Sequence, residues 1–192
     1  PGAGTTEYTT YGGDDIFWAK YNSSGELVWT DKNYSVDPGN HNSYWYDDDR
    51  GYSIVVDESG NVYSTGYFWG WGMAGVNHVG SNGSTDIFWR KHNSSGERVW
   101  TRSAGGQKNS GQSSSRDYGY SIAIDTSGNV YVTGTFYYVA DFDPVGTLNL
   151  DGDTGFDMFI AKYNNNGTLV NTAPTVSSAP TVTTNEDTEY AF

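Results

Sequence analysis

Short stretches of alternating apolar and polar residues, separated by turn residues, run along the chain. In GYSIVVDESGNVYSTGYF at 51–68, Tyr52 and Ile54 fall on one side of an extended strand and Val55 on the other. The DESGN segment that follows is rich in turn residues, and its Gly60 can take the positive φ of a tight turn. Apolar residues then resume, so the pattern predicts a β-hairpin.

A second hairpin pattern is DDIFWAKYNSSGELVWT at 14–30. Here Ile16 and Trp18 share one strand face and Phe17 lies on the other, while NSSGE at 22–26 supplies the turn. Apolar residues on both faces predict a sheet that is covered on both sides.

Both patterns recur along the chain. Residues 14–30 return at 85–101 and again at 156–172, with a spacing of 71 residues each time, and residues 51–68 return at 119–136 after 68 residues. Because the two patterns alternate, the chain consists of half a module followed by two complete modules of about 70 residues.

A module of two hairpins predicts a four-stranded antiparallel sheet, and sheets with two apolar faces must stack. The predicted fold is therefore all-β, a β-propeller segment over 1–172 with a half blade at 14–30 and blades at 51–101 and 119–172. Known propellers use about 4 to 8 blades. We therefore expect an incomplete ring of about two and a half blades, completed by a missing part of the chain or by another chain.

The residues GYSIAIDTSGNVYVTGTF, DFDP and DMFIAKYNNNGTLV resemble the SBBP-type bacterial β-propeller repeat, and DIFWAKYNSSGELVWT resembles its second half. The resemblance covers about 14–172 and implies a many-bladed propeller in a large secreted or cell-surface bacterial protein, an extracellular location and no shared catalytic centre. Residues 173–192 resemble the linker and first strand of a cadherin-like or immunoglobulin-like sandwich repeat.

The third module departs from the repeat at its end. Trp29 and Trp100 occupy matching positions, whereas the third copy has Asn171, soon followed by Pro174 and Pro180. We therefore expect the third module to be the last blade.

Composition excludes several classes of protein. The 23 acidic and 10 basic residues give a net charge of −13, with no basic cluster to neutralise phosphates, so a nucleic-acid partner is not expected. No apolar run approaches the roughly 18 residues of a membrane span, so no transmembrane segment is expected. The absence of Cys removes disulfides, thiol nucleophiles and Cys-ligated metals.

The repeat also separates scaffold from candidate site. The tight turns lie at one end of each predicted blade, so the segments outside the repeat, at 31–50, 69–84, 102–118 and 137–155, lie at the other end. Variable loops gathered on one face of a rigid scaffold are common binding sites.

Aromatic residues in these segments suit sugar rings, whose C–H groups stack on flat aromatic faces. The partner would be a polysaccharide or a surface protein. Packing between blades is the alternative to ligand binding. Packing is favoured for Trp69 and Tyr137, which directly follow Phe68 and Phe136, and the two roles are weighted equally for the aromatic residues at 44–46. The candidate ligand-binding residues are Tyr44, Trp45, Tyr46, Trp69, Trp71, Tyr137 and Tyr138.

Carboxylates in the last of these segments are candidate ligands for Ca²⁺, which binds oxygen atoms. Asp157 recurs as Asp15 and Asp86, so it is expected to shape the turn before a strand instead. No other cofactor is expected. The candidate Ca²⁺ ligands are Asp141, Asp143, Asp151 and Asp153.

Two other charged features are assigned to the scaffold. The three aspartates at 47–49 are expected to form a solvated, mutually repelling run that Arg50 partly relieves. Arg90 takes the place of Ala19 and Ala161 on a strand face, which predicts a carboxylate partner on an adjacent blade.

Three functions remain compatible with the sequence. The first, which we favour, is a non-catalytic interaction or adhesion module, and the second is a purely structural spacer. The third is a polysaccharide-acting enzyme, which needs two carboxyls at a fixed separation. Its candidate carboxyls are Asp47, Asp48, Asp49, Asp141 and Asp143.

Overall fold

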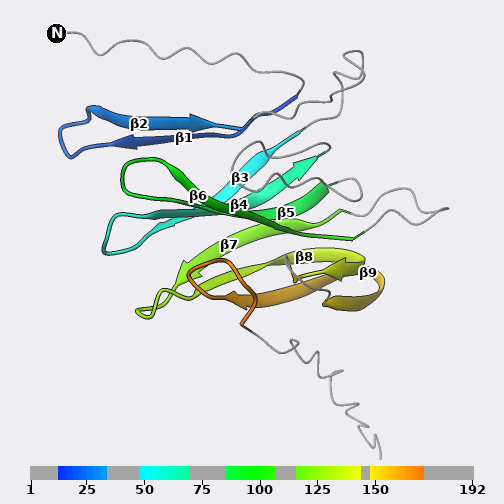
Figure 1. The fold of residues 1–192 in the computed structure, drawn as a ribbon. Coiled ribbons are helices and arrows are strands. Elements are labelled where there is room, and N and C mark those ends of the chain that lie inside the picture. Colours follow the sequence, from blue (N-terminus) through cyan, green and yellow to red (C-terminus); the bar gives the residue numbers. More distant parts are fainter. Residues whose placement is uncertain (1–12, 34–47, 70–84, 107–115, 144–147, 171–192) are drawn as a thin grey trace, which may run out of the picture.

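A computed structural model describes the chain over residues 13–33, 48–69, 85–106, 116–143 and 148–170. Within these ranges nine strands form three antiparallel sheets. Figure 1 shows the sheets stacked one above another, without closure into a ring. The predicted all-β fold of propeller-like blades is therefore confirmed. Among the described residues, no helix is long and apolar enough to cross a membrane.

The middle sheet is a complete four-stranded blade. Its strands follow chain order: β3 (Arg50–Val56), β4 (Val62–Trp69), β5 (Thr85–His92) and β6 (Arg98–Ala104). Because neighbouring strands are antiparallel, the β3–β4 and β5–β6 turns lie at the same end of the blade.

The flanking sheets are partial. The first contains β1 (Phe17–Tyr21) and β2 (Leu27–Lys32). The last contains β7 (Tyr118–Ile124), β8 (Val130–Asp141) and β9 (Asn149–Tyr163).

A fourth strand begins to pair at the edge of the last sheet. Leu169 forms a bridge with Tyr163, and the Val170 N–H donates to the Lys162 carbonyl at 2.9 Å. The residues predicted to start a sandwich repeat, 173–192, lie outside the described residues.

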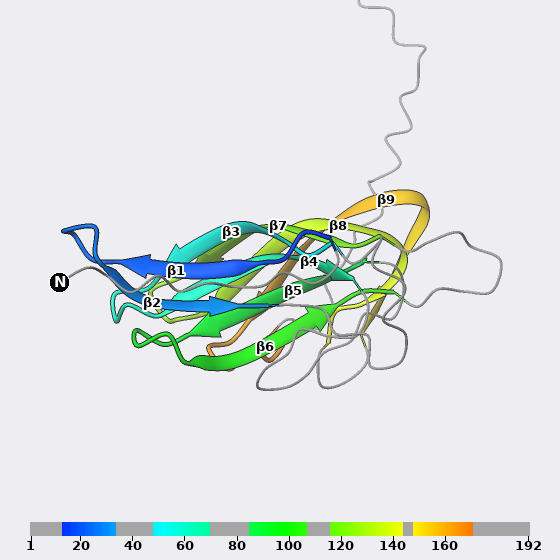
Figure 2. The same ribbon diagram turned by 90° about the horizontal axis from the view of Figure 1, so that it is seen from above.

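Short polar side chains build the turns. In the β5–β6 turn the Asn93 Oδ1 accepts hydrogen bonds from the backbone N–H groups of Ser95 and Glu97, and Gly96 has a φ of 87°. Gly60 in the β3–β4 turn has a φ of 79°, as its turn predicted. Figure 2 shows the β1–β2 and β5–β6 turns at one end of the stack and the curled start of β9 at the other.

Apolar side chains fill both gaps between the sheets. Phe88 packs in a cluster with Trp18 of the first sheet, whereas Ile87 and Trp89 belong to a larger cluster that includes Tyr163 of the last sheet. Neighbouring residues of β5 thus point to opposite sheets, which confirms that the middle sheet is covered on both sides.

One segment differs from its predicted structure. Residues 137–155 were expected to be a variable loop, but β8 and β9 continue their ladder outward through the pairs Val139–Asp151 and Asp141–Asn149. The apolar residues of this arm explain the difference, because Ala140 and Leu150 are buried in the larger cluster.

Tryptophan side chains link each sheet to the next. The Trp29 Nε1–H donates to the Ser94 carbonyl at 3.2 Å, and the Trp100 Nε1–H donates to the Asn165 carbonyl at 2.9 Å. Ser94 and Asn165 occupy matching turn positions, so we call each bond a tryptophan link. The third copy has Asn171 at this position, which has no indole N–H to donate.

Candidate functional site

Seven aromatic rings form a connected network across the middle and last sheets, and we call them the aromatic row. Neighbouring ring centroids lie between 4.4 and 6.3 Å apart. Its members are Tyr52, Tyr67, Tyr118, Tyr120, Phe156, Tyr137 and Tyr138.

Two members of the row come from β-bulges at matching positions. The β3–β4 register shifts between Gly51 and Ser53, which leaves Tyr52 without a cross-strand partner, and the same shift in β7 leaves Tyr120 without one. A bulge redirects the side chain of the extra residue. Tyr52 and Tyr120 are accordingly 46% and 48% exposed, with ring centroids 5.6 Å apart.

Glycines opposite the bulges make this geometry possible. A Cβ on Gly66 would lie 1.8 Å from the Arg50 carbonyl oxygen, and a Cβ on Gly134 would lie 1.9 Å from that of Tyr118. Because no side chain fits at these distances, the repeated glycines allow the close approach of the two strands at each bulge.

The other end of the row contains an unusual backbone conformation. Tyr138 has a φ of 62° at a register shift between Tyr137 and Val139. Non-glycine residues rarely adopt this conformation, and such residues cluster at functional sites. The Tyr138 ring packs edge-on against Tyr137 at 4.4 Å, and Tyr137 lies 5.1 Å from Phe156.

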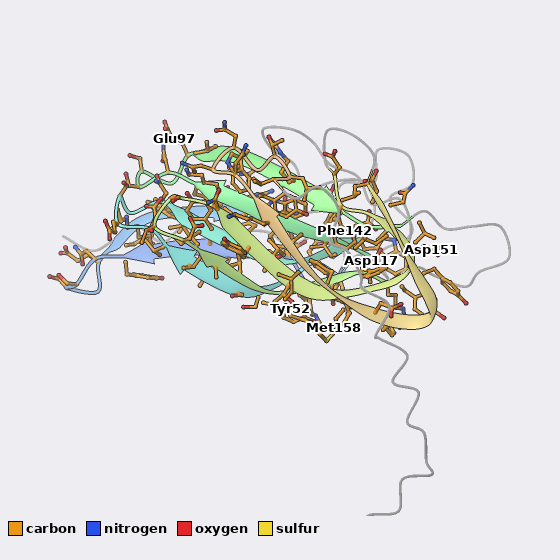
Figure 3. All side chains as sticks on the ribbon, turned by 90° about the horizontal axis from the view of Figure 1, so that it is seen from below. Tyr52, Glu97, Asp117, Phe142, Asp151 and Met158 are labelled. Atoms are coloured by element: carbon orange, nitrogen blue, oxygen red, sulfur yellow. The ribbon has the colours of Figure 1, made fainter. Side chains whose placement is uncertain are left out.

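Charged groups lie near both ends of the row. Arg50, the cross-strand partner of Tyr67, forms ion pairs with Asp14 at 2.8 Å and Asp48 at 3.8 Å. At the other end, exposed Asp151 pairs with Val139, next to Tyr138. Figure 3 shows Tyr52 away from Asp151, which lies at the arm end of the stack.

Two phenol groups of the row, those of Tyr67 and Tyr137, have raised pKa values and are protonated at neutral pH. Burial raises the pKa of Tyr67 to about 12, and the hydrogen bond with Tyr138 raises the pKa of Tyr137. Protonated phenols can donate and accept hydrogen bonds beside a flat apolar ring. The row can therefore stack on a ligand and hydrogen-bond it.

The structure brings together only part of the predicted binding site. Tyr137 and Tyr138 are in the row, whereas Trp69 is half-buried at the end of β4, with its backbone N–H donating to the Asp49 Oδ1 at 3.0 Å. Tyr44, Trp45, Tyr46 and Trp71 lie outside the described residues.

Sequence reasoning missed Tyr52 and Tyr120. It assigned every repeated residue to packing, yet both tyrosines repeat and stay half exposed. The available signal was Gly-Tyr-Ser in one strand opposite a repeated glycine in the next, which is compatible with a bulge.

The candidate Ca²⁺ ligands do not converge in the described part of the chain. The Asp141 Oδ1 accepts hydrogen bonds from the backbone N–H groups of Asp143 and Leu148, so Asp141 helps to close the β8–β9 turn. The side chain of Asp153 lies outside the described residues, and no three carboxylates or imidazoles in that part could hold a metal ion.

The prediction for Asp49 was wrong. Asp49 was expected in a solvated run but is buried, as is Asp117 at the matching position of the next blade. The two oxygens of Asp117 accept hydrogen bonds from the backbone N–H groups of Gly106 at 2.9 Å and Tyr137 at 2.8 Å. Burial raises the pKa of Asp117 to about 6. These aspartates fasten strand ends together, and Figure 3 shows Asp117 inside the stack.

Asp86 and Asp157 also differ from their predicted role. Both lie within strands, β5 and β9, where each pairs with the phenylalanine of the neighbouring strand. A Cβ on Gly105 would lie 2.4 Å from the Asp86 carboxyl, and one on Gly152 would lie 2.3 Å from that of Asp157. They therefore pack against glycine backbone and do not shape a preceding turn.

The prediction of a carboxylate partner for Arg90 is confirmed. Buried Arg90 lies 3.7 Å from Asp31 of the first sheet, which also accepts hydrogen bonds from His92 at 2.8 Å and Arg98 at 2.6 Å. Burial alone would raise the pKa of Asp31, but the hydrogen bonds from His92 and Arg98 outweigh it and hold that pKa well below its usual range. Burial lowers the pKa of His92, and Asp31 only partly offsets this effect.

Stacked antiparallel sheets with repeated turns, bulges and intersheet links define a propeller-type repeat protein. Comparison with family models supports this class, because residues 45–70 and 99–135 match the β-propeller repeat called SBBP. The chain therefore carries SBBP repeats, over about a third of its length. The match does not extend to residues 173–192, and no curated protein matches the chain.

Proposed function

We propose that the chain is a non-catalytic interaction module of a secreted or cell-surface bacterial protein and that the aromatic row binds carbohydrate. The observation that carries the proposal is the row itself, in which Tyr52 and Tyr120 repeat from blade to blade and remain half exposed. The extracellular location rests on the resemblance to SBBP repeat proteins.

The extent of the row favours an extended ligand. The rings reach from β3 of the middle sheet to β8 and β9 of the last sheet, and those of Tyr118 and Tyr120 are nearly parallel, at 11°. Flat apolar faces with phenol groups at their rims, and the charged groups of Arg50, Asp48 and Asp151 near the ends, suit the C–H faces and hydroxyls of sugars.

Calorimetric titration with soluble hexasaccharides tests the proposal. Cellohexaose, chitohexaose and laminarihexaose are the probes, and the double variant Tyr52→Ala/Tyr120→Ala is compared with the natural sequence. We expect at least one probe to bind and the double variant to bind it at least tenfold more weakly, a loss of about 1.4 kcal/mol.

Tyr21→Ala is the matched control, because Tyr21 is an exposed tyrosine of the first sheet that lies outside the row. It should bind the probe like the natural sequence. A double variant that binds as well as this control would contradict the role of the row, and absence of binding to all three probes would favour a structural spacer. Hydrolysis of a probe would favour the enzyme alternative.

A further inference from the structure

One buried carboxylate holds the arm end of the aromatic row. Asp117 lies just before β7, and its Oδ1 accepts the backbone N–H of Tyr137, a member of the row, at 2.8 Å. Its Oδ2 accepts the backbone N–H of Gly106, which follows β6, at 2.9 Å. Figure 3 shows Asp117 at the arm end of the stack, away from Glu97 in the β5–β6 turn. One side chain therefore ties the row to the middle sheet.

The second hydrogen bond acts on the same short segment from its other side. Gly106 approaches the arm so closely that a Cβ on it would lie 2.0 Å from the Val139 carbonyl oxygen. The preceding residue, Gly105, exchanges two backbone hydrogen bonds with Asp141, at 3.2 and 3.0 Å. The carboxylate thus fixes the backbone on both sides of Tyr138, the residue with positive φ.

The matching aspartate of the middle blade makes similar bonds away from the row. The Asp49 Oδ1 accepts the backbone N–H of Trp69 at 3.0 Å, and its Oδ2 accepts an Nδ2–H of Asn33 at 3.0 Å. Trp69 is the counterpart of Tyr137 in the repeat but is not one of the seven members of the row. The two aspartates therefore have the same structural role, and only Asp117 acts on the row.

From this arrangement we propose that Asp117 is a positioning residue, whose ionised carboxylate holds Tyr137 and Tyr138 in the conformation that binds an extended polysaccharide. The inference rests on the proposed function, because it concerns the same row. A proton on the carboxyl breaks one of the two hydrogen bonds, since each N–H points to a different oxygen and a protonated oxygen becomes a donor. Binding therefore weakens when Asp117 is protonated.

Asp117 titrates close to neutral pH. Burial raises its pKa to about 6, and the hydrogen bonds from the two backbone N–H groups offset this effect only in part. The charged side chains beside its contacts along the chain are exposed Arg116, Asp86, which follows the carbonyl that accepts the Asp117 N–H, and Asp141, opposite Gly105. Arg116 favours the ionised carboxylate, and the two aspartates oppose it.

Protonation of Asp117 does not by itself unfold the protein. The ordinary pKa of an aspartate is 3.8, so the folded protein takes up this proton before the unfolded chain as the pH falls. The contribution of Asp117 to the free energy of unfolding is therefore largest below pH 3.8 and is lost as the pH rises through about 6. Weaker binding in acid would accordingly report a local change at the arm end of the row.

Calorimetric titration at pH 7.5 and pH 5.0 tests the proposal, with cellohexaose, chitohexaose and laminarihexaose as the probes. We expect the natural sequence to bind a probe about three- to tenfold more weakly at pH 5.0, because a carboxyl that titrates near pH 6 is about 90% protonated there. Asp117→Asn cannot accept both N–H groups and does not titrate. At both pH values it should bind as weakly as the natural sequence does at pH 5.0.

Two further variants are controls. Asp49→Asn removes the matching carboxylate from the middle blade, where it holds Trp69, so its binding should keep the pH dependence of the natural sequence. His92→Gln should keep it as well, because His92 contacts Asp31 of the first sheet and lies outside the row. Circular dichroism checks that each variant is folded at both pH values.

Amide resonances of the free protein test the two hydrogen bonds without a ligand. The backbone N–H protons of Tyr137 and Gly106 should shift together with one midpoint near pH 6, because both bond the same carboxyl. In Asp117→Asn neither resonance should titrate in this range.

Three results would overturn the role of Asp117 and leave the proposed function intact. They are equal affinity of the natural sequence for a probe at both pH values, a pH dependence of binding that persists in Asp117→Asn, and amide resonances of Tyr137 and Gly106 that do not titrate. Absence of binding to every probe at pH 7.5 is a different failure. It would defeat the proposed function, and the role of Asp117 in binding with it.

Discussion

Tyr138 shows how a single residue can carry strain at the candidate site. Its positive φ brings its side chain against Tyr137, at the point where the β8–β9 register shifts. A left-handed conformation costs a non-glycine residue about 1–2 kcal/mol. The pairing of the arm on either side of the shift holds the backbone in this state.

Substitution of Tyr138 separates backbone strain from ring contacts. Tyr138→Gly and Tyr138→Ala both remove the ring, but only glycine adopts positive φ without steric cost. We expect the glycine variant to have a free energy of unfolding about 1 kcal/mol higher than the alanine variant. Urea unfolding measures the difference, and an alanine variant of equal or greater stability would show that φ is relaxed at this position.

Individual residues were predicted with uneven success, for a physical reason. The carboxylate partner of Arg90 could be predicted because Arg90 carries a charge at a position where the other two copies have alanine. Asp49 was misassigned because the run of three aspartates obscured its match with Asp117, although each of the two lies two residues before a Gly-Tyr-Ser segment. The repeat identifies buried polar groups only when they are aligned with it.

At the scale of elements, the tryptophan links differ in their surroundings. Trp100 is buried and donates to Asn165, whereas Trp29 is half-buried and donates to Ser94. Both acceptors, Asn165 and Ser94, are exposed turn residues that water can reach, so the two links differ in the burial of the indole rings.

Phenylalanine replacements compare the two links directly. Trp100→Phe should lower the free energy of unfolding by about 2 kcal/mol, because ring volume is lost from the core, and Trp29→Phe by less than about 1 kcal/mol. Chemical denaturation of both variants measures these losses. An equal loss at the two positions would mean that the burial of the ring does not set the cost.

Strands were predicted where alternation and turn chemistry agreed, as in β3–β4 and β5–β6. The paired arm of β8 and β9 was not predicted, because the sequence pattern of this segment has no counterpart in the other module. Its polar residues suggested a loop. Its pairing depends on Ala140 and Leu150 reaching a cluster built by distant strands. The aromatic row likewise depends on bulges and on packing between sheets, which local sequence does not specify.

At the scale of the molecule, stacked sheets contact only their neighbours, so the terminal sheet can detach without unfolding of the rest. The β1–β2 sheet is held to the middle blade by the first apolar cluster and by Asp31, which faces His92, Arg90 and Arg98. Detachment exposes His92 to water.

Detachment should therefore depend on pH. The pKa of His92 is below its usual 6.5 in the folded protein, so the detached state takes up a proton first as the pH falls. The interface is stable above about pH 6.5 and weakens below it. Between pH 7.5 and 5.5 we expect opening of β1–β2 to increase by up to about tenfold.

Hydrogen exchange of the β1–β2 amides, corrected for intrinsic rates, measures this opening. In His92→Gln, which keeps an N–H donor but does not titrate, the pH dependence should disappear. Asp117 titrates in the same range but lies between the middle and last sheets, so exchange in β1–β2 separates the two groups. Equal pH dependence in the natural and His92→Gln proteins would exclude His92 as the cause.

The tryptophan links also have a consequence for biosynthesis. Trp29 and Trp100 each bond a residue that lies 65 positions later in the chain. At a translation rate of about 5–20 residues per second, the acceptor residue is synthesised roughly 3–13 seconds after the tryptophan. During that interval the most recently completed blade exposes an apolar face, because the next blade has not yet been synthesised. We therefore expect aggregation and chaperone binding of the nascent chain to occur mainly at that blade.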